Sequence, residues 1–469
     1  MKRMIALPIS TSRESQDERY LRMGTAKIPG LIVGLALPSV ISMLVSSLYN
    51  LADTYFVSSI GTSAAAAVGV IMPLMGIMQA IGMTCGTGAA SNISRLLGQG
   101  DQESANQFAT TAFFTSLFFS ILMAIYGFSD AAPLVRALGA TEGIFPYALD
   151  YANIILIGAP FIVTSFTLNN ILRSEGNSFL SMIGISVGVV LNIILDPLFI
   201  FTFDMGIAGA AYATILSQII SFLILLGLFI FNKSSLSLHP KHFRFNFSTY
   251  SGILKMGSPS LFRQSLTSIG QVLMNLAAGP FGDAAIAAVS IVSRVSMIVY
   301  SAMLGLGQGY QPVAGYNYGA RKLDRLNEAF WFTVKMAFAS AVICVSFLAI
   351  FANQVMEIFQ TNDIQVVQIG VSIIRLQALT LPLQAWVIIT NMTFQSMGRG
   401  LPSFILALSR NGFCYIPCVL LLPQLFGVNG IIAIQPITDI LSLLIALPLS
   451  LRLLKEIKPK LEFDNTISS

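Results

Sequence analysis

Hydrophobic residues occupy most of the chain in long runs that are interrupted only by short polar segments. The runs follow one another from about residue 28 to residue 455. Each is roughly 20 to 30 residues long, which is enough for a helix to cross a lipid bilayer. The pattern therefore predicts an all-α membrane protein.

We expect twelve membrane-spanning helices, one for each run. Several runs exceed the ~20 residues that a crossing requires, so some helices should be tilted or extend beyond the bilayer. The expected limits are 28–59, 64–94, 108–129, 145–171, 179–202, 207–231, 250–279, 285–316, 329–352, 364–393, 402–424 and 428–454.

The composition supports a membrane protein. Hydrophobic residues make up 55% of the chain and charged residues only 10%, whereas soluble domains carry about 25% charged residues. Residues 1–27 are polar and contain no short apolar segment of the kind found in a cleaved signal peptide, so we expect them to form an N-terminal tail.

Positive charges fall almost entirely on one side of the predicted topology. Twelve spans place both tails and the loops after even-numbered helices on the same side, with twenty lysines and arginines, and leave Arg136 alone on the other. The positive-inside rule then places both termini in the cytoplasm. The basic residues are scattered over several loops and tails, so we expect contact with the lipid bilayer and no nucleic-acid partner.

The second half of the chain repeats the first at a constant offset in the numbering. "ALPSVISMLVSSL" from Ala36 corresponds to "GSPSLFRQSLTSI" from Gly257, so that Pro38 and Ser39 match Pro259 and Ser260. Matched glycines indicate a repeated backbone geometry, because glycine permits close helix contact and special torsions. The glycine pairs include Gly61 with Gly282, Gly86 with Gly307, Gly88 with Gly309, Gly98 with Gly319, Gly206 with Gly427, and Gly209 with Gly430.

This repeat predicts two pseudo-symmetric bundles of six helices in the same orientation. The expected parts are an N-lobe of residues 28–231, a cytoplasmic linker of residues 232–249, a C-lobe of residues 250–455 and a C-terminal tail of residues 456–469. In transporters, such halves flank a central site and rock to open it to either side. A scaffold without transport, as in some channels, is the alternative. Since one chain supplies both lobes, we expect a monomer.

The first helix carries a continuous polar stripe. Its members are spaced three or four residues apart, as they are on one helical face, and the repeat helix carries a similar stripe. We expect both helices to line a shared cavity, and Pro38 to act as a hinge because a proline breaks a backbone hydrogen bond. The first stripe comprises Ser39, Ser42, Ser46, Asn50 and Asp53, and the second comprises Ser260, Arg263, Thr267, Gln271 and Met274.

Ionisable groups inside a membrane are costly and indicate function. Asn192 and Asp196 share one face of the fifth helix, and Thr214 lies in the sixth. If they converge with Asp53, the four side chains offer oxygen atoms that suit a small cation such as Na⁺. Two neighbouring carboxylates in a low dielectric also favour holding a proton. A pair of structural aspartates is the alternative.

The second half lacks this acidic set and carries arginines in its spans. Asp439 is its one deep carboxylate; it is a candidate cavity or substrate residue, and we expect it to pair with one of the arginines. Gln384 and the repeat-stripe residues Arg263 and Gln271 are candidate cavity or substrate residues, together with Asn50 of the first half. The intramembrane arginines are Arg263, Arg294, Arg375 and Arg410, of which Arg294 is also a candidate substrate residue.

Several short motifs in the expected order resemble those of the multidrug and toxic compound extrusion (MATE) transporters, in particular the DinF-like branch with MepA-like members. The resemblance covers residues 28–455. The motifs are "YNLADTYFV" from Tyr49, "AAAAVGV" from Ala64, "LRSEGNSF" from Leu172, "LNIILDPLFI" from Leu191, "GIAGAAYAT" from Gly206 and "QSMGRG" from Gln395.

This resemblance implies a V-shaped transporter in the bacterial cytoplasmic membrane. It implies export of cationic or amphipathic drugs in exchange for Na⁺ or H⁺, with no other cofactor. The cation site of the family falls on Asp53, Asn192, Asp196 and Thr214, the helix-1 proline on Pro38, and a helix-4 tyrosine on Tyr151. The NorM branch places acids in the seventh and tenth helices, where this chain has Arg263 and Arg375.

Two other functions are compatible with the residues. A flippase or exporter of a lipid-linked or anionic metabolite would explain the arginines of the second half, although related flippases often have fourteen spans. A channel would conduct passively, without alternating access. An enzyme is not expected, because the spans contain no Ser/His/Asp arrangement, Cys/His pair, HExxH motif or phosphate loop.

Overall fold

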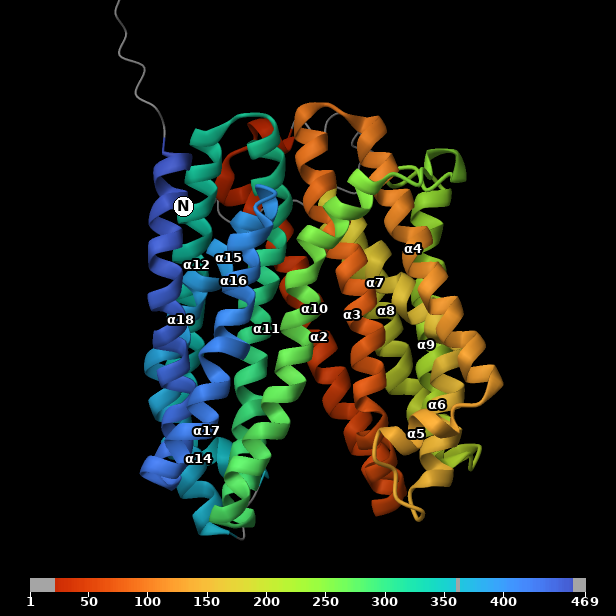
Figure 1. Cartoon of the computed structure of the whole chain (residues 1–469), viewed down its shortest axis with the longest axis vertical. Helices are drawn as coiled ribbons and strands as arrows, with labels where there is room; N and C mark the ends of the chain where they lie inside the picture. Colours follow the sequence, from red (N-terminus) through yellow and green to blue (C-terminus); the bar gives the residue numbers. More distant parts are fainter. Residues whose placement is uncertain (1–21, 360–362, 459–469) are drawn as a thin grey trace, which may run out of the picture.

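The computed structural model describes residues 22–359 and 363–458, apart from the side chains of residues 50–55, 58 and 62. Its helices form two bundles side by side (Figure 1). The N-lobe contains α2 (Ile28–Ile60), α3 (Thr62–Gln99), α4 (Gln102–Ser129), α5 (Ala132–Ala137), α6 (Phe145–Ile157), α7 (Ala159–Ser174), α8 (Ser178–Pro197), η1 (Leu198–Thr202) and α9 (Gly206–Ile230).

The linker between the lobes contains one short helix, η2 (Pro240–His242), before the C-lobe begins. The C-lobe contains α10 (Phe247–Ala278), η3 (Gly279–Phe281), α11 (Asp283–Gly319), α12 (Leu323–Ile350), α13 (Ala352–Phe359), α14 (Ile364–Thr380), η4 (Leu381–Leu383), α15 (Gln384–Ser396), α16 (Gly400–Leu408), η5 (Ser409–Phe413), α17 (Tyr415–Phe426) and α18 (Val428–Ile457).

Each of the twelve predicted spans corresponds to one helix or one broken helix. In the described part of the chain, ten segments are long and apolar enough to cross a membrane, and α6 with α7 form an eleventh that bends by 52° at Gly158. The twelfth is α10, which has the length of a span but too many polar residues to be recognised by hydropathy.

Helix breaks occur where the sequence interrupts backbone hydrogen bonding. Pro160 follows the bend at Gly158, and Pro382 lies in η4 between α14 and α15. A proline cannot donate a backbone hydrogen bond and clashes with the preceding turn. In the fifth span of each lobe a π-helical segment interrupts the α-helix: η1 directly after Pro197, and η5 between α16 and α17. Such segments often lie at functional sites.

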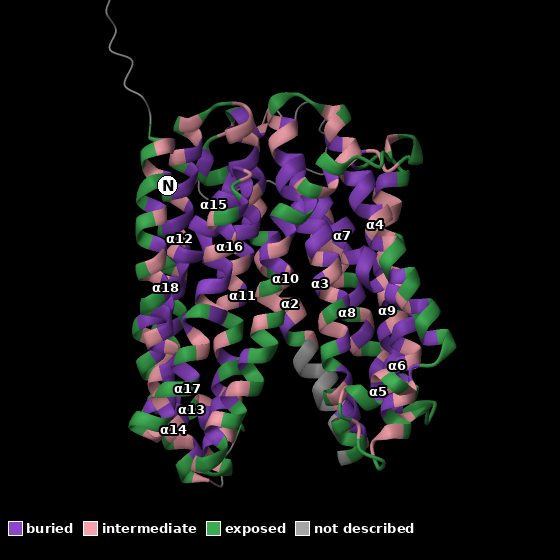
Figure 2. Cartoon of the chain, viewed as in Figure 1, coloured by how far each residue is buried: buried purple, intermediate pink, exposed green. Residues whose placement is uncertain are grey.

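The two lobes meet at one end of the molecule and diverge toward the other, which gives a V shape (Figure 1). Buried residues gather where the lobes meet, at the end where the linker also lies (Figure 2). The contacts are between α3 and α10 and between α2 and α11, so the first two helices of each lobe form the interface.

Glycine allows these helices to approach closely in a pseudo-symmetric manner. A Cβ atom on Gly98 would lie 2.1 Å from the carbonyl oxygen of Tyr316, and one on Gly319 would lie 2.0 Å from that of Arg95. Since the offset of the repeat relates Gly98 to Gly319 and Arg95 to Tyr316, the two contacts are equivalent. Only glycine fits at such a contact without moving the backbone.

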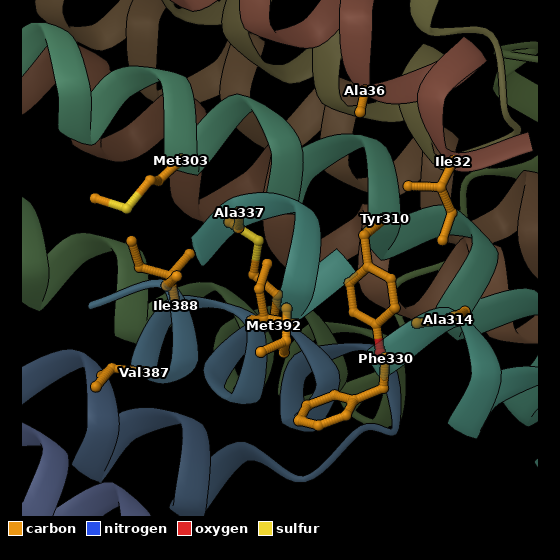
Figure 3. Packing of buried hydrophobic residues seen from close by; sticks show 14 of the residues in the cluster. Ile32, Ala36, Met303, Tyr310, Ala314, Phe330, Ala337, Val387, Ile388 and Met392 are labelled. Carbon is orange, nitrogen blue, oxygen red and sulfur yellow. The ribbon is translucent and has the colours of Figure 1, made fainter. Parts of the chain in front are cut away.

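The first turns of α2 and α10 each pack into the opposite lobe. Ile32 and Ala36 of α2 lie in a buried cluster with Tyr310 and Phe330 of the C-lobe (Figure 3). Ile253 of α10, the repeat equivalent of Ile32, lies in a cluster of α3, α4 and α7 of the N-lobe. The lobes are therefore joined by a reciprocal exchange of helix ends, which the predicted boundaries at residues 28 and 250 did not include.

Candidate functional site

Three of the four predicted cation-site residues lie together inside the N-lobe. The side-chain amide of Asn192 donates hydrogen bonds to Asp196 Oδ1 at 3.2 Å and to Thr214 Oγ1 at 3.4 Å. Asn192 and Thr214 are each 3% exposed, and Asp196 is fully buried. A carboxylate, an amide oxygen and a hydroxyl thus converge between α8 and α9, which pack against each other.

The local sequence explains how α8 presents these groups. Asn192 and Asp196 are four residues apart, so they lie on one helical face. Gly188, one turn earlier on the same face, lets α9 approach, because a Cβ there would lie 2.9 Å from the Cβ of Ser221. Pro197 then ends the α-helical hydrogen bonding, and the chain continues as the π-helical η1. The carboxylate of Asp196 therefore lies where the helix changes its geometry.

Asp53 and Asn50, the other predicted residues of this region, have side chains that lie outside the described residues. Their backbone belongs to α2, which packs against α8 and also contacts α9. The helix that carries Asp53 therefore packs against the two helices that carry the Asn192–Asp196–Thr214 cluster. A role for Asp53 and Asn50 remains a prediction.

The serine end of the α2 stripe does not face an open cavity. Ser39 and Ser42 are 1% and 4% exposed, and both hydroxyls donate to carbonyl oxygens four residues earlier in α2. In this state that part of the stripe lines no cavity, because the lobes are closed together at this end, and its contact with a shared cavity stays a prediction. Pro38 is buried between the part of α2 that packs in the C-lobe and the rest of the helix.

Tyr151, the predicted helix-4 tyrosine, is a core residue in this structure. It is fully buried on α6 within the main hydrophobic cluster of the N-lobe. Its hydroxyl lies 3.9 Å from the sulfur of Met75. Its burial gives it a packing role here, and a contact with substrate remains a prediction.

In the C-lobe, Asp439 pairs with Arg410. The guanidinium Nε of Arg410 lies 3.2 Å from Asp439 Oδ1, and its charged end lies 4.4 Å from the ring centre of Tyr300. Asp439 is fully buried and also accepts a hydrogen bond from Gln435 at 3.0 Å. Gln435 is the repeat equivalent of Thr214. In the C-lobe, an internal arginine thus neutralises the buried carboxylate.

A small cavity of about 30 Å³ lies beside this ion pair, between α10, α11, α15, α16 and η5. Arg263 and Gln384, two of the predicted cavity residues, line it together with Arg410. Gln384 is fully buried and donates to the backbone oxygen of Asp439 at 3.4 Å. Gln271, further along α10, is exposed and donates to Asn275, so it does not join this group.

The other two intramembrane arginines lie apart from the cavity. Arg294 on α11 and Arg375 on α14 are both exposed, and neither forms an ion pair with any described residue. Arg294 is on the same face of α11 as Ser301, which accepts a hydrogen bond from Ser47 of α2 at 3.1 Å. Arg294 thus points toward the space between the lobes, two turns beyond their contact.

Sequence reasoning missed the polar contacts that join the lobes. Arg173, one of the twenty basic residues predicted on the cytoplasmic side, is 6% exposed and donates to Gln308 of the C-lobe and to Asn170. Glu175 is 1% exposed and accepts from the backbone of Ser235 at 2.8 Å, which fixes the start of the linker. The motif "LRSEGNS" from Leu172 is similar to "FQSMGRG" from Phe394 in the second half. This similarity was the sequence signal that could have identified the region as important.

The N-lobe cluster is suited to hard, small cations or to a proton. It offers oxygen ligands, which Na⁺ and similar ions prefer, and lacks thiolate or imidazole ligands for transition metals. No group of three or more His, Cys, Asp or Glu side chains that could hold a metal ion occurs among the described residues. A carboxylate with neutral oxygen donors matches a monovalent ion better than a divalent one.

Comparison with known proteins identifies relatives over nearly the whole chain. The MatE family model matches residues 38–198 and 259–421, two stretches that begin at the equivalent prolines of the repeat, Pro38 and Pro259. The chain is 26% identical over 422 residues to the multidrug export protein MepA of Staphylococcus haemolyticus, covering 89% of this chain and 92% of that protein. Both matches span the two lobes.

Solved structures of similar fold include two transporters of the MOP superfamily. One is the outward-facing conformation of a multidrug resistance MATE family transporter, with a TM-score of 0.88 and 28% identity over 95% of this chain and all of that one. The other is a transporter from Pyrococcus furiosus, with a TM-score of 0.87 and 29% identity over 94% of this chain and 99% of that one.

Proposed function

The chain belongs to the MatE family of membrane transporters, and from this premise we propose that it exports cationic or amphipathic organic compounds in exchange for Na⁺ or H⁺. Its relatives that are named multidrug export proteins support the substrate class. The V shape, closed at one end and open at the other, supports transport by alternating access. We further propose that the protein acts as a monomer.

The observation that carries this proposal is the buried cluster of Asn192, Asp196 and Thr214. Asp196 is fully buried, and a carboxylate in this environment is costly unless a proton or cation compensates its charge. An ion that binds at Asp196 therefore changes the charge at the interface of α8 and α9. We propose that this change shifts the balance between outward-open and inward-open states.

Coupling requires that ion and drug favour different states. If the ion binds better in one state and the drug in the other, binding of the ion promotes release of the drug on one side of the membrane. Binding of the drug then promotes release of the ion on the opposite side. Asp53 lies on α2, which packs against α8 and contacts α9, and we propose that it completes the site. Since α2 also packs in the C-lobe, movement of this helix would link ion occupancy to the position of the two lobes.

Replacement of Asp196 by asparagine tests the proposal. Asparagine keeps the shape of the side chain but removes the charge that an ion would neutralise. We expect Asp196→Asn to reduce gradient-driven efflux of a fluorescent organic cation from everted vesicles by on the order of tenfold, within the usual range of coupling free energies. The assay would impose Na⁺ and pH gradients separately.

Asp204 offers a matched control, because it is an exposed aspartate close to the same helix and its φ of 54° is also compatible with asparagine. We expect Asp204→Asn to export at the wild-type rate. Coupled efflux at the wild-type rate by correctly folded Asp196→Asn would contradict the assigned site. Loss of efflux in Asn192→Ala and Thr214→Val would favour Na⁺, whereas retention would favour H⁺, which needs only the carboxylate.

A further inference from the structure

The cavity beside the Arg410–Asp439 pair has a chemistry opposite to that of the N-lobe cluster. We propose that it is a subsite for an oxyanion, namely the carboxylate or phosphate group of an amphipathic compound. This inference rests on the proposed export function and specifies part of its substrate class: compounds that carry an anionic group in addition to, or instead of, a positive charge.

The charge of the cavity is the first support. Two guanidinium groups, Arg263 and Arg410, line it. Asp439 compensates Arg410 through their contact at 3.2 Å, but Arg263 forms no ion pair with any residue that the structure describes. The cavity therefore carries one uncompensated positive charge inside the membrane-spanning part of the protein, which is costly unless an anion or water stabilises it.

The donors of Arg263 are also suited to an oxyanion by their geometry. A guanidinium presents several N–H groups in a planar fork that matches the two oxygens of a carboxylate or phosphate. Arg263 is half-buried on α10 and lines the cavity. Its guanidinium can therefore contact a ligand that enters the cavity.

A buried polar atom without a partner is the second support. Gln384 is fully buried and lines the cavity, and its Oε1 has no hydrogen-bond partner among the described residues. Its amide nitrogen donates to the backbone of Asp439, which fixes the orientation of the side chain. A buried acceptor of this kind costs free energy unless a ligand or water donates to it. A hydroxyl or N–H next to the anionic group of a ligand would do so.

The size and remaining walls of the cavity define which part of a compound it takes. About 30 Å³ accommodates one or two waters, so a charged head group enters and the rest of the molecule stays outside. The neighbouring wall is apolar and includes Leu304, Val387, Ile388 and Met392. Aliphatic and methionine side chains of this kind suit a flexible apolar body next to the head group.

A matched pair of dyes tests the inference: a rhodamine with a free carboxylate and the methyl ester of the same rhodamine. Binding to the full-length protein in phosphatidylcholine nanodiscs would be measured by fluorescence anisotropy. We expect Arg263→Gln to weaken binding of the acid about tenfold, as for loss of one charge-assisted contact, and to leave binding of the ester within about twofold. Arg375→Gln makes the same change on an exposed arginine outside the cavity and should alter neither affinity.

The outcomes separate this inference from the export function. If Arg263→Gln weakens both dyes equally, or neither, the oxyanion subsite is wrong. If the wild type binds and exports the ester but does not bind the acid, the subsite is wrong while export stands. If the wild type binds neither dye, both proposals are contradicted. A selective loss of acid binding in Arg263→Gln, with ester binding within about twofold, supports the oxyanion subsite.

The same variants distinguish a soluble anion from a lipid head group. If nanodiscs that contain phosphatidylglycerol lower the affinity of the wild type for the acid, and Arg263→Gln removes this competition, then the subsite accepts a lipid phosphate. If phosphatidylglycerol has no effect, the acid binds at a subsite reserved for carboxylate-bearing compounds. Either result is consistent with an oxyanion at Arg263.

Discussion

At the scale of single residues, the two lobes surround a buried carboxylate with different side chains. In the N-lobe, Asn192 donates to Asp196 at 3.2 Å, and we propose that a transported ion binds at this carboxylate. In the C-lobe, Arg410 lies 3.2 Å from Asp439 and acts as a permanent internal cation. On this assignment, the repeat produced one site that can gain and lose charge and one that cannot.

This difference predicts how the C-lobe pair responds to substitution. Arg410→Gln leaves Asp439 as an unpaired buried charge and should destabilise the protein by about 3–5 kcal/mol, whereas the neutral pair in Arg410→Gln/Asp439→Asn should restore most of that loss. Thermal unfolding in detergent, followed by intrinsic fluorescence, measures both effects. Arg375→Gln, on an exposed residue, should change stability by at most about 0.5 kcal/mol. A double variant no more stable than Arg410→Gln would contradict the role of the pair.

At the scale of elements, α2 and α10 are the helices whose positions connect the lobes. Each begins in the opposite lobe, and each has a proline, Pro38 or Pro259, just after the exchanged segment. A proline in a helix removes a hydrogen bond and permits bending. The two equivalent prolines make these points the natural hinges for a rocking motion.

A cross-link between α3 and α10 tests whether the lobes separate at their closed end. The hydroxyls of Thr87 and Ser260 lie 3.1 Å apart across this interface, which suits a disulfide. In a chain whose four native cysteines are replaced by alanine, oxidation of Thr87→Cys/Ser260→Cys should stop drug efflux, and reduction should restore it. The single variants should be insensitive to oxidant. Efflux by the fully cross-linked protein would contradict a rocking motion at this interface.

At the scale of the whole molecule, the distribution of charge defines orientation in the membrane. The closed end carries the linker with Lys241 and Arg244, whereas the open end carries Arg136, which contacts Glu142 at 4.0 Å. By the positive-inside rule, the closed end faces the cytoplasm. We therefore propose that the structure is an outward-facing state, with both termini on the cytoplasmic side.

Labelling with a membrane-impermeant maleimide tests this orientation. His239 in the linker and Glu142 at the open end are both exposed. In the same cysteine-free background, Glu142→Cys should be labelled in intact cells, whereas His239→Cys should be labelled only after permeabilisation. The reverse pattern would show that the charge asymmetry had been misinterpreted.

Much of the fold and part of the site were predictable from local sequence. Apolar runs define the spans because burial in lipid depends mainly on composition. The constant offset between the two halves reveals the lobes, because equivalent contacts, such as those of Gly98 and Gly319, need equivalent glycines. The four-residue spacing of Asn192 and Asp196 places both on one face, since the helical period alone decides it. Only α10 is poorly recognised, because it contains too many polar residues for a span to stand out by hydropathy.

Tertiary structure decided everything that depends on which helices meet. No local pattern could show that Arg410 and not another arginine pairs with Asp439, that Arg173 is buried against Gln308, or that the serine end of the α2 stripe is enclosed between closed lobes. These contacts join residues far apart in the chain, and their geometry follows from helix packing. The sequence by itself determined which spans carry polar and charged side chains, because composition and helical period decide this. The packing of the two lobes determined which of these side chains contact one another.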